Sequence, residues 1–252
     1  MATAIDILGV RFRRTSKSEV HERILRCVER RERAVIPCLN AHALNLAHEN
    51  PWLCQFFNEA HAVIVDGYGV VLAAWLLGMP LPQRFTYADW MWELAALCEM
   101  KAMRLYLLGA RPGVAQEAAR RLRAKHRGLK IAGTHHGYFD KSNSSEENQA
   151  VVNEINGTEA DILVVGFGMP LQEQWLLENW PDLNARVALT GGGVFDYVSG
   201  RVVRPPSFLA NNGLEWLGRL LLEPRRLWRR YLIGNPLFLW RILQQRFGSS
   251  RG

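Results

Sequence analysis

Short apolar runs alternate with amphipathic stretches along residues 1–200. The apolar runs are rich in β-branched side chains, as in buried strands, and lie at residues 5–10, 34–39, 62–65, 104–108, 129–134, 162–165 and 187–190. Helical spacing of apolar positions marks residues 17–31, 87–100, 113–126, 146–155 and 172–179. Ser16 and Glu19 have the spacing of a capping box at the first of these helices. The alternation predicts an α/β fold with a mostly parallel sheet and helices on both faces.

The positive charge is concentrated in residues 201–252. The whole chain has a formal net charge of +7, whereas this segment has ten arginines, no lysine and two glutamates, a local net charge of +8. Composition changes near residues 201–206, where Pro205 and Pro206 are consecutive and interrupt regular structure. We therefore predict a core domain at residues 1–200 and a basic, amphipathic helical appendage at residues 201–252.

Aromatic side chains lie between the arginines of this segment, namely Phe208, Trp216, Trp228, Tyr231, Phe238, Trp240 and Phe247. Arginine interleaved with aromatic residues and leucine is typical of a helix in an anionic membrane interface. A solvated basic helix and a nucleic-acid contact are the alternatives. We favour the membrane surface and expect no nucleic-acid partner. A spanning helix is not expected, because the longest uncharged run, residues 67–83, contains three glycines and two prolines.

The remaining composition is that of a folded protein in a reducing compartment. Apolar residues make up 48% and charged residues 22% of the chain, which excludes a disordered or collagen-like protein. The four cysteines form no CxxC pair, so neither a zinc site nor a disulfide framework is expected. The first residues have neither the basic nor the apolar region of a signal peptide.

Glycines gather where several predicted strands end, at residues 66–69, 109–113, 166–168 and 191–193. Ligands of open α/β sheets bind beyond the carboxyl ends of the strands, and glycine lets backbone amides approach a phosphate closely. None of these clusters matches GxGxxG or GxxxxGK. Ordinary turns explain each cluster alone, but together at one edge they indicate a phosphate or nucleotide site.

Asp66 is the best catalytic candidate, because it directly follows the predicted strand at residues 62–65. A carboxylate there can act as a general base or as the N-cap of the next helix. The sequence has no HExxH, GxSxG or DxD motif, so we expect arginines and backbone amides to neutralise a bound diphosphate. Arg219, Arg226 and Arg230 recur at spacings of seven and four residues, and Arg229 lies three residues beyond Arg226.

Five motifs occur in order between residues 40 and 236. They are VDGYGV at 65–70, GFGMPLQE at 166–173, FDYVSG at 195–200, GLEWLGRL at 213–220 and EPRRLWRRY at 223–231. Together they resemble the WecG/TagA/CpsF family of bacterial glycosyltransferases. The resemblance implies a Rossmann-like core, an appendage that helps to complete the active site, and neither a cofactor nor a metal.

The resemblance also implies a reaction and a place in the cell. The enzyme would be inverting and metal-independent, and would move a sugar from a UDP-sugar donor to a polyprenyl-diphosphate-linked sugar during cell-surface polysaccharide synthesis. It would act as a peripheral protein on an anionic membrane surface, at the cytoplasmic face of the bacterial inner membrane. The donor sugar and the oligomeric state stay open, a homo-oligomer being one alternative.

The family's functional positions fall on particular residues of this chain. Asp66 matches the proposed base. Positions that bind substrate match Asn40, Arg84, Tyr138, Gln172, Asp196, Arg219, Arg226 and Arg229. Among them, Tyr138 and Asp196 match a tyrosine that stacks on the base and a carboxylate that faces the uracil. Cys38 stands in place of the family's threonine, and Leu171 in place of a lysine.

These assignments predict a mechanism. Asp66 takes the proton of the acceptor hydroxyl, while Arg219, Arg226 and Arg229 stabilise the leaving diphosphate. We further expect the appendage to complete the site only at a membrane. The alternatives are a non-catalytic nucleotide- or RNA-binding protein with a basic arm and a pyridine-nucleotide oxidoreductase, the latter disfavoured by the absent GxGxxG.

Overall fold

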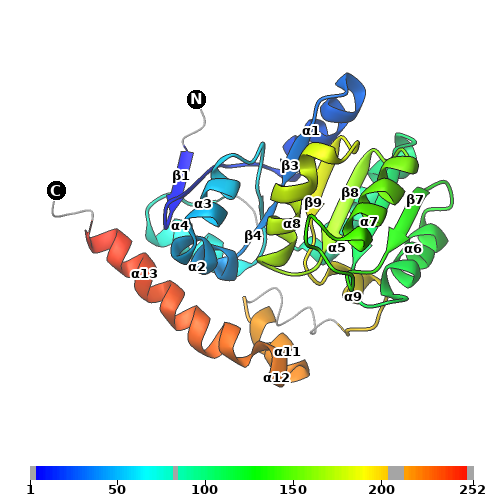
Figure 1. The fold of residues 1–252 in the computed structure, drawn as a ribbon. Coiled ribbons are helices and arrows are strands. Elements are labelled where there is room, and N and C mark those ends of the chain that lie inside the picture. Colours follow the sequence, from blue (N-terminus) through cyan, green and yellow to red (C-terminus); the bar gives the residue numbers. More distant parts are fainter. Residues whose placement is uncertain (1–3, 82–84, 204–212, 249–252) are drawn as a thin grey trace.

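The computed structural model describes residues 4–81, 85–203 and 213–248. Its main sheet has five strands, each parallel to its neighbours, in the order β3 (Ala34–Ile36), β9 (Val187–Thr190), β8 (Ile162–Gly166), β6 (Arg104–Gly109) and β7 (Lys130–His135). Helices cover both faces of this sheet (Figure 1). The predicted α/β fold with a parallel sheet is therefore confirmed.

Alternate residues of each strand are buried on opposite faces of the sheet. In β6, Leu105 and Leu107 belong to one hydrophobic cluster, and Tyr106 and Leu108 belong to the other. The first cluster includes side chains of α1 (Lys17–Arg30), α5 (Tyr87–Met100), α6 (Val114–Lys125) and α9 (Val194–Val198). The second includes side chains of α7 (Glu146–Gly157) and α8 (Leu171–Asn179), the latter followed by a 3-10 turn, Trp180–Asp182. The capping box of Ser16 and Glu19 at α1 is confirmed.

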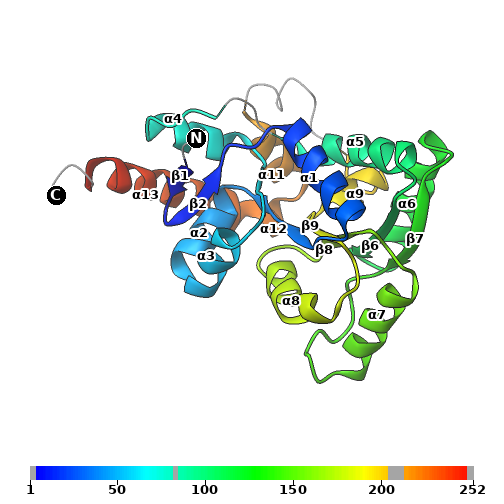
Figure 2. The same cartoon turned by 90° about the horizontal axis from the view of Figure 1, so that it is seen from above.

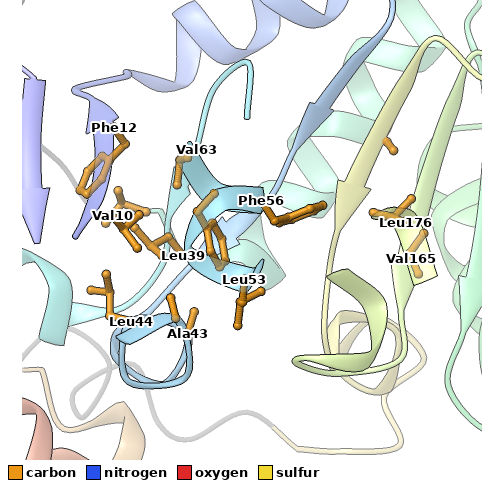
Figure 3. Close-up of a cluster of buried hydrophobic side chains, with 14 of the residues drawn as sticks. Val10, Phe12, Leu39, Ala43, Leu44, Leu53, Phe56, Val63, Val165 and Leu176 are labelled. Carbon is orange, nitrogen blue, oxygen red and sulfur yellow. The ribbon is translucent and has the colours of Figure 1, made fainter. Parts of the chain in front are cut away.

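A smaller lobe adjoins the free edge of β3. Its two parallel strands are β4 (Cys38–Leu39) and β5 (Ile64–Val65), with an antiparallel hairpin of β1 (Ala4–Ile7) and β2 (Val10–Arg13) beside them. The lobe also contains α2 (Ala41–Glu49), α3 (Pro51–Asn58) and α4 (Tyr68–Leu76). Figure 3 shows side chains of the hairpin, β4, α2 and α3 directed into one apolar cluster.

Two predicted strands are wrong in detail. Residues 5–10 do not form one strand, because Leu8 and Gly9 both have positive φ (54° and 87°) and turn the chain into the β1–β2 hairpin. Residues 34–39 are divided at Pro37, which has no N–H to donate to a ladder. The first part is β3 of the main sheet, and the second part is β4, which pairs with β5. This division carries the chain from the main sheet into the smaller lobe.

The C-terminal segment is helical where it is described, as predicted, and consists of α11 (Glu215–Leu222), α12 (Pro224–Trp228), the π-helical turn η2 (Arg229–Ile233) and α13 (Gly234–Gly248). Helix α13 packs against α2 and α4 of the smaller lobe (Figures 1 and 2). The Arg241 guanidinium donates to the Asn45 side-chain oxygen (3.1 Å) and to Glu49 (2.6 Å). Gln245 accepts from the Leu8 N–H (2.9 Å). No helix in the described part of the chain has the length and apolar character needed to span a membrane. The domain boundary near residue 201 stays a prediction.

Candidate active site

Two cavities lie where the strands end, and the C-terminal segment lines both. The smaller, which we call the Asp66 cavity, measures about 260 Å³, and its polar lining is Asn40, His42, Asp66, Tyr68, Glu215, Arg219, Arg230 and Asn235. The larger, the glycine-loop cavity, measures about 800 Å³, and its lining includes Arg111, Tyr138, Lys141, Gly166, Gly168, Gly192, Asp196, Arg201, Glu223 and Arg226. The C-terminal segment contributes Arg219 and Arg230 to the Asp66 cavity, and Glu223 and Arg226 to the glycine-loop cavity.

Asp66 directly follows β5, and its side chain is half-buried at the Asp66 cavity. Its backbone N–H donates to the Leu39 carbonyl (2.8 Å), which extends the β4–β5 ladder to this residue. The carboxylate accepts from the N–H of Tyr87 (3.2 Å), at the start of α5. Gly67, with φ 87°, occupies the N-cap of α4, so Asp66 does not cap the helix that follows it.

The pKa of Asp66 is raised above its ordinary value. Burial is the largest cause, and the negative charge of Glu215 adds to it. The Tyr87 amide and the guanidinium groups of Arg219 and Arg230 act in the opposite direction. A half-buried carboxylate with a raised pKa is suited to accept a proton from a sugar hydroxyl.

Arg219 of α11 and Arg230 of η2 bring positive charge into the Asp66 cavity. Within the described ranges, the Nε atom of each is buried without a hydrogen-bond partner. The guanidinium of Arg219 also lies 5.4 Å from the centre of the Tyr197 ring, which holds it against α9. Two cations converging beside a carboxylate form a binding place for a diphosphate.

The structure includes Arg230 in this cavity but leaves Arg229 outside it. Arg229 is exposed and lies 5.2 Å from the centre of the Trp228 ring. The expected common face of Arg219, Arg226 and Arg230 therefore holds for Arg219 and Arg230 but not for Arg226, which lines the other cavity. A second helix begins at Pro224, and η2 has π-helical spacing. The spacing of Arg219, Arg226 and Arg230 was the sequence signal for Arg230.

Three further residues of the Asp66 cavity have polar roles. Asn40 caps α2, since its Oδ1 accepts from the Ala43 N–H (3.0 Å). Burial, with the positive charge of Arg230, lowers the pKa of His42 to about 4, so this imidazole is neutral at pH 7. Sequence reasoning missed both His42, which lies in no motif, and Glu215, which lies in the motif at 213–220 but was not singled out within it.

The glycine-loop cavity contains the predicted residues Tyr138, Asp196 and Arg226. The side chain of Tyr138 is 64% exposed. Its ring face is therefore accessible for stacking on a flat ligand. Burial raises the pKa of Asp196, against the influence of Arg201 and Arg226. Arg226 also forms an ion pair with Glu223.

Glycine is required here for contact between loops. A Cβ atom at Gly109 would lie 2.4 Å from the carbonyl oxygen of Gly166, and one at Gly166 would lie 2.8 Å from that of Gly192. Three backbone amides of these loops already have partners: those of Gly168 and Gly192 donate to Gln172 Oε1 (3.2 and 3.1 Å), and that of Gly191 donates to the Val165 carbonyl (2.8 Å). The side chains are therefore the better candidates for holding a diphosphate.

Gln172 is fully buried below these loops. Its Nε2 donates to Glu173 Oε1 (2.7 Å) while its Oε1 joins the two glycine loops. Burial raises the pKa of Glu173 to about 7. Nearby, the Thr190 hydroxyl accepts from the Cys38 N–H (2.8 Å), and the Cys38 side chain is buried. Gln172 thus contacts the loops that form the cavity.

The other predicted position, Arg84, lies outside the described residues. Among the residues that are described, no group of three or more His, Cys, Asp or Glu side chains could hold a metal ion.

Asp66, Arg219 and Arg230 thus line one cavity, beyond the carboxyl end of β5, where ligands of parallel α/β sheets bind. The chain belongs to the glycosyl transferase WecG/TagA/CpsF family, whose family model matches residues 5–252. It is therefore a glycosyltransferase, which confirms the resemblance found in the motifs.

Curated relatives from Staphylococcus aureus strains MRSA252 and NCTC 8325 / PS 47 are each 28% identical over 240 residues, covering 94% of this chain and 91% of the relative. Both are named N-acetylglucosaminyldiphosphoundecaprenol N-acetyl-beta-D-mannosaminyltransferase.

Proposed function

We propose that this glycosyltransferase moves a sugar from a UDP-sugar to a sugar carried on polyprenyl diphosphate, with inversion at the anomeric carbon and without a metal. The names of the S. aureus relatives, which specify a diphosphoundecaprenol-linked acceptor, support this acceptor class. The observation that carries the proposal is the placement of Asp66 in one cavity with Arg219 and Arg230.

In this proposal the acceptor occupies the Asp66 cavity. Arg219 and Arg230 bind its diphosphate, and its sugar hydroxyl lies against the Asp66 carboxylate. Asp66 takes the hydroxyl proton as the oxygen forms a bond to the donor's anomeric carbon. The bond from that carbon to the UDP oxygen breaks on the opposite face, so the configuration inverts and UDP leaves with the electron pair.

The donor occupies the glycine-loop cavity. Tyr138 stacks on the uracil, Asp196 accepts a hydrogen bond from its N–H, and Arg226 with Arg201 neutralises the leaving diphosphate. This division assigns Arg226 to the donor and Arg219 to the acceptor, because the two arginines line different cavities. Arg229 is exposed on η2, and in this proposal it contacts the anionic membrane surface.

We place the reaction at the cytoplasmic face of the bacterial inner membrane. Large apolar side chains of the appendage are exposed, including Leu221 (72%), Trp240 (60%) and Phe247 (67%). Trp240 and Phe247 occur on the same helix as the exposed Arg246, the combination that favours an anionic lipid surface. The enzyme would there meet an acceptor anchored in the bilayer.

Replacing the base tests the proposal. Asp66→Asn should lower kcat by about 10²–10⁴, because general-base catalysis is lost, while both KM values change little. The assay measures UDP release from a panel of UDP-sugars with a short polyprenyl-diphosphate-linked N-acetylglucosamine. Asp182→Asn, an exposed carboxylate that lines neither cavity, is the matched control. Turnover of Asp66→Asn close to that of the control would remove Asp66 from this role.

A further inference from the structure

Helix α4 begins at Tyr68, two residues after Asp66, and has apolar side chains on its exposed face as well as on its buried face. Its inner face, with Val70, Ala73 and Ala74, is fully buried in the core. A helix that is apolar on all sides is normally buried on all sides. Here Tyr68 is 49% exposed and Trp75 is 65% exposed.

The outer face of α4 lines an apolar groove of about 330 Å³. Its helical residues are spaced as one stripe of a helix, and the segment after α4 completes the lining, so that the groove consists of Tyr68, Val71, Leu72, Trp75, Pro80 and Leu81. None of these six side chains is charged. The groove lies within the long uncharged run at residues 67–83. The mechanism predicted from the sequence gives the apolar side chains of this run no function.

This groove adjoins the Asp66 cavity, because Tyr68 and Leu72 line both. A ligand that crosses Tyr68 and Leu72 would have one end beside the guanidinium groups of Arg219 and Arg230 and the other on the outer face of α4. The first end is charged, and the second is lined by uncharged and mostly apolar side chains. An amphiphile with an anionic head and a hydrocarbon chain matches that arrangement.

We propose that the α4 groove binds the first isoprene units of the acceptor's polyprenyl chain. The inference rests on the proposed function, in which Arg219 and Arg230 hold the acceptor diphosphate. The groove then sets where the lipid leaves the enzyme, and it orients the acceptor sugar toward Asp66. Trp75, at the outer end of the stripe, covers the chain on its way to the bilayer.

Direct binding tests the groove separately from catalysis. The probes are farnesyl diphosphate and isopentenyl diphosphate, which share the diphosphate and differ in chain length, titrated calorimetrically into the full chain without lipid. Trp75→Ser should weaken farnesyl diphosphate binding about tenfold, equivalent to about 1.4 kcal/mol, and leave isopentenyl diphosphate binding unchanged. Because Trp75 is mostly exposed, the variant should fold normally.

Met100→Ser is the control, since Met100 is 70% exposed at the end of α5 and lines neither the groove nor the two cavities. It should leave both affinities unchanged. Equal loss for the two probes, or no loss for farnesyl diphosphate, in Trp75→Ser would overturn the proposal. So would a Trp75→Ser defect confined to binding of anionic phospholipid vesicles, which would make Trp75 a bilayer anchor.

Sugar transfer distinguishes failure of the groove from failure of the proposed function. If the wild-type chain shows the expected chain-length preference yet transfers no sugar to any polyprenyl-diphosphate-linked acceptor, the groove stands and the proposed reaction is wrong. If it transfers sugar equally well to short and long acceptors, the reaction stands and the groove is wrong.

Discussion

The two cavities at the strand ends differ in how far their charged side chains are shielded from water. Burial shifts the pKa of Asp66 and His42 in the Asp66 cavity and that of Asp196 in the glycine-loop cavity, and in the Asp66 cavity two arginine Nε atoms are also buried without a described partner. The glycine-loop cavity is larger, and several of its charged side chains, such as Arg226, are exposed. Electrostatic interactions are stronger where water is excluded. The comparison assigns the proton transfer to the small cavity and much of the nucleotide binding to the large one.

Helices α11 and α12 join the two cavities. Arg219 on α11 lines the first and Arg226 on α12 lines the second, with Pro224 between them. A single short segment therefore supplies one cation to each cavity. This arrangement makes the two cavities separable by mutation.

The largest effect should come from exchanging these cations. Arg226→Gln should raise the KM for the UDP-sugar by about 10–100-fold, since a charge-assisted hydrogen bond is worth about 1.5–3 kcal/mol. Arg219→Gln should raise the KM for the lipid-linked acceptor by a similar factor. Steady-state kinetics with each substrate varied in turn measures both. If Arg226→Gln and Arg219→Gln raise the same KM, the two cavities do not hold different substrates.

A smaller effect is expected from the buried pair below the glycine loops. Glu173→Leu removes the acceptor for Gln172 Nε2, which should loosen the hold of Gln172 on Gly168 and Gly192. We expect the KM for the UDP-sugar to rise about tenfold while the acceptor KM is unchanged, because a buried donor loses its partner.

Glu173→Gln is the control, because its amide oxygen can still accept from Gln172. Glu173→Gln should therefore have the same KM for the UDP-sugar as the wild-type chain. If the negative charge of Glu173 were what matters, Glu173→Gln would raise this KM as Glu173→Leu does. Thermal melting of both variants shows whether the loss is local. An increase in both KM values for Glu173→Leu would contradict a role restricted to the glycine loops.

The smallest effect is a shift in the pH profile of kcat. Asp66 must be deprotonated to act, so activity falls as the pH decreases through its raised pKa. Glu215→Gln removes a negative charge that favours the protonated form of Asp66, so the acid limb should move to lower pH. Arg230→Gln removes a positive charge and should move the limb to higher pH. Shifts of the same sign in the two variants would exclude Asp66 as the titrating group.

The sequence predicted the main sheet well because its strands are continuous apolar runs between helices of clear periodicity. It failed at Leu8 and Gly9, where two consecutive positive φ values turn the chain within an apolar run. Helices α2, α3 and α4 were additional to the predicted elements, and α4 in particular has no amphipathic pattern.

The candidate site was predictable to the extent that motifs carried it. Asp66 and Arg219 do lie together, and Tyr138, Asp196 and Arg226 share the second cavity. The division into two cavities was not predictable, because it depends on where α11 ends and on the π-helical register of η2. Helical spacing did place Arg230 beside Arg219, but counted across Pro224 it could not show that Arg226 lines the other cavity.

The attachment of α13 to the smaller lobe, through Arg241 and Gln245, has a consequence for protein synthesis. Domains fold from the N-terminus while the ribosome is still extending the chain. The strands of the main sheet are therefore translated before the guanidinium groups beside Asp66 and before α13. A nascent chain would stay inactive until the ribosome has added residues 215–248.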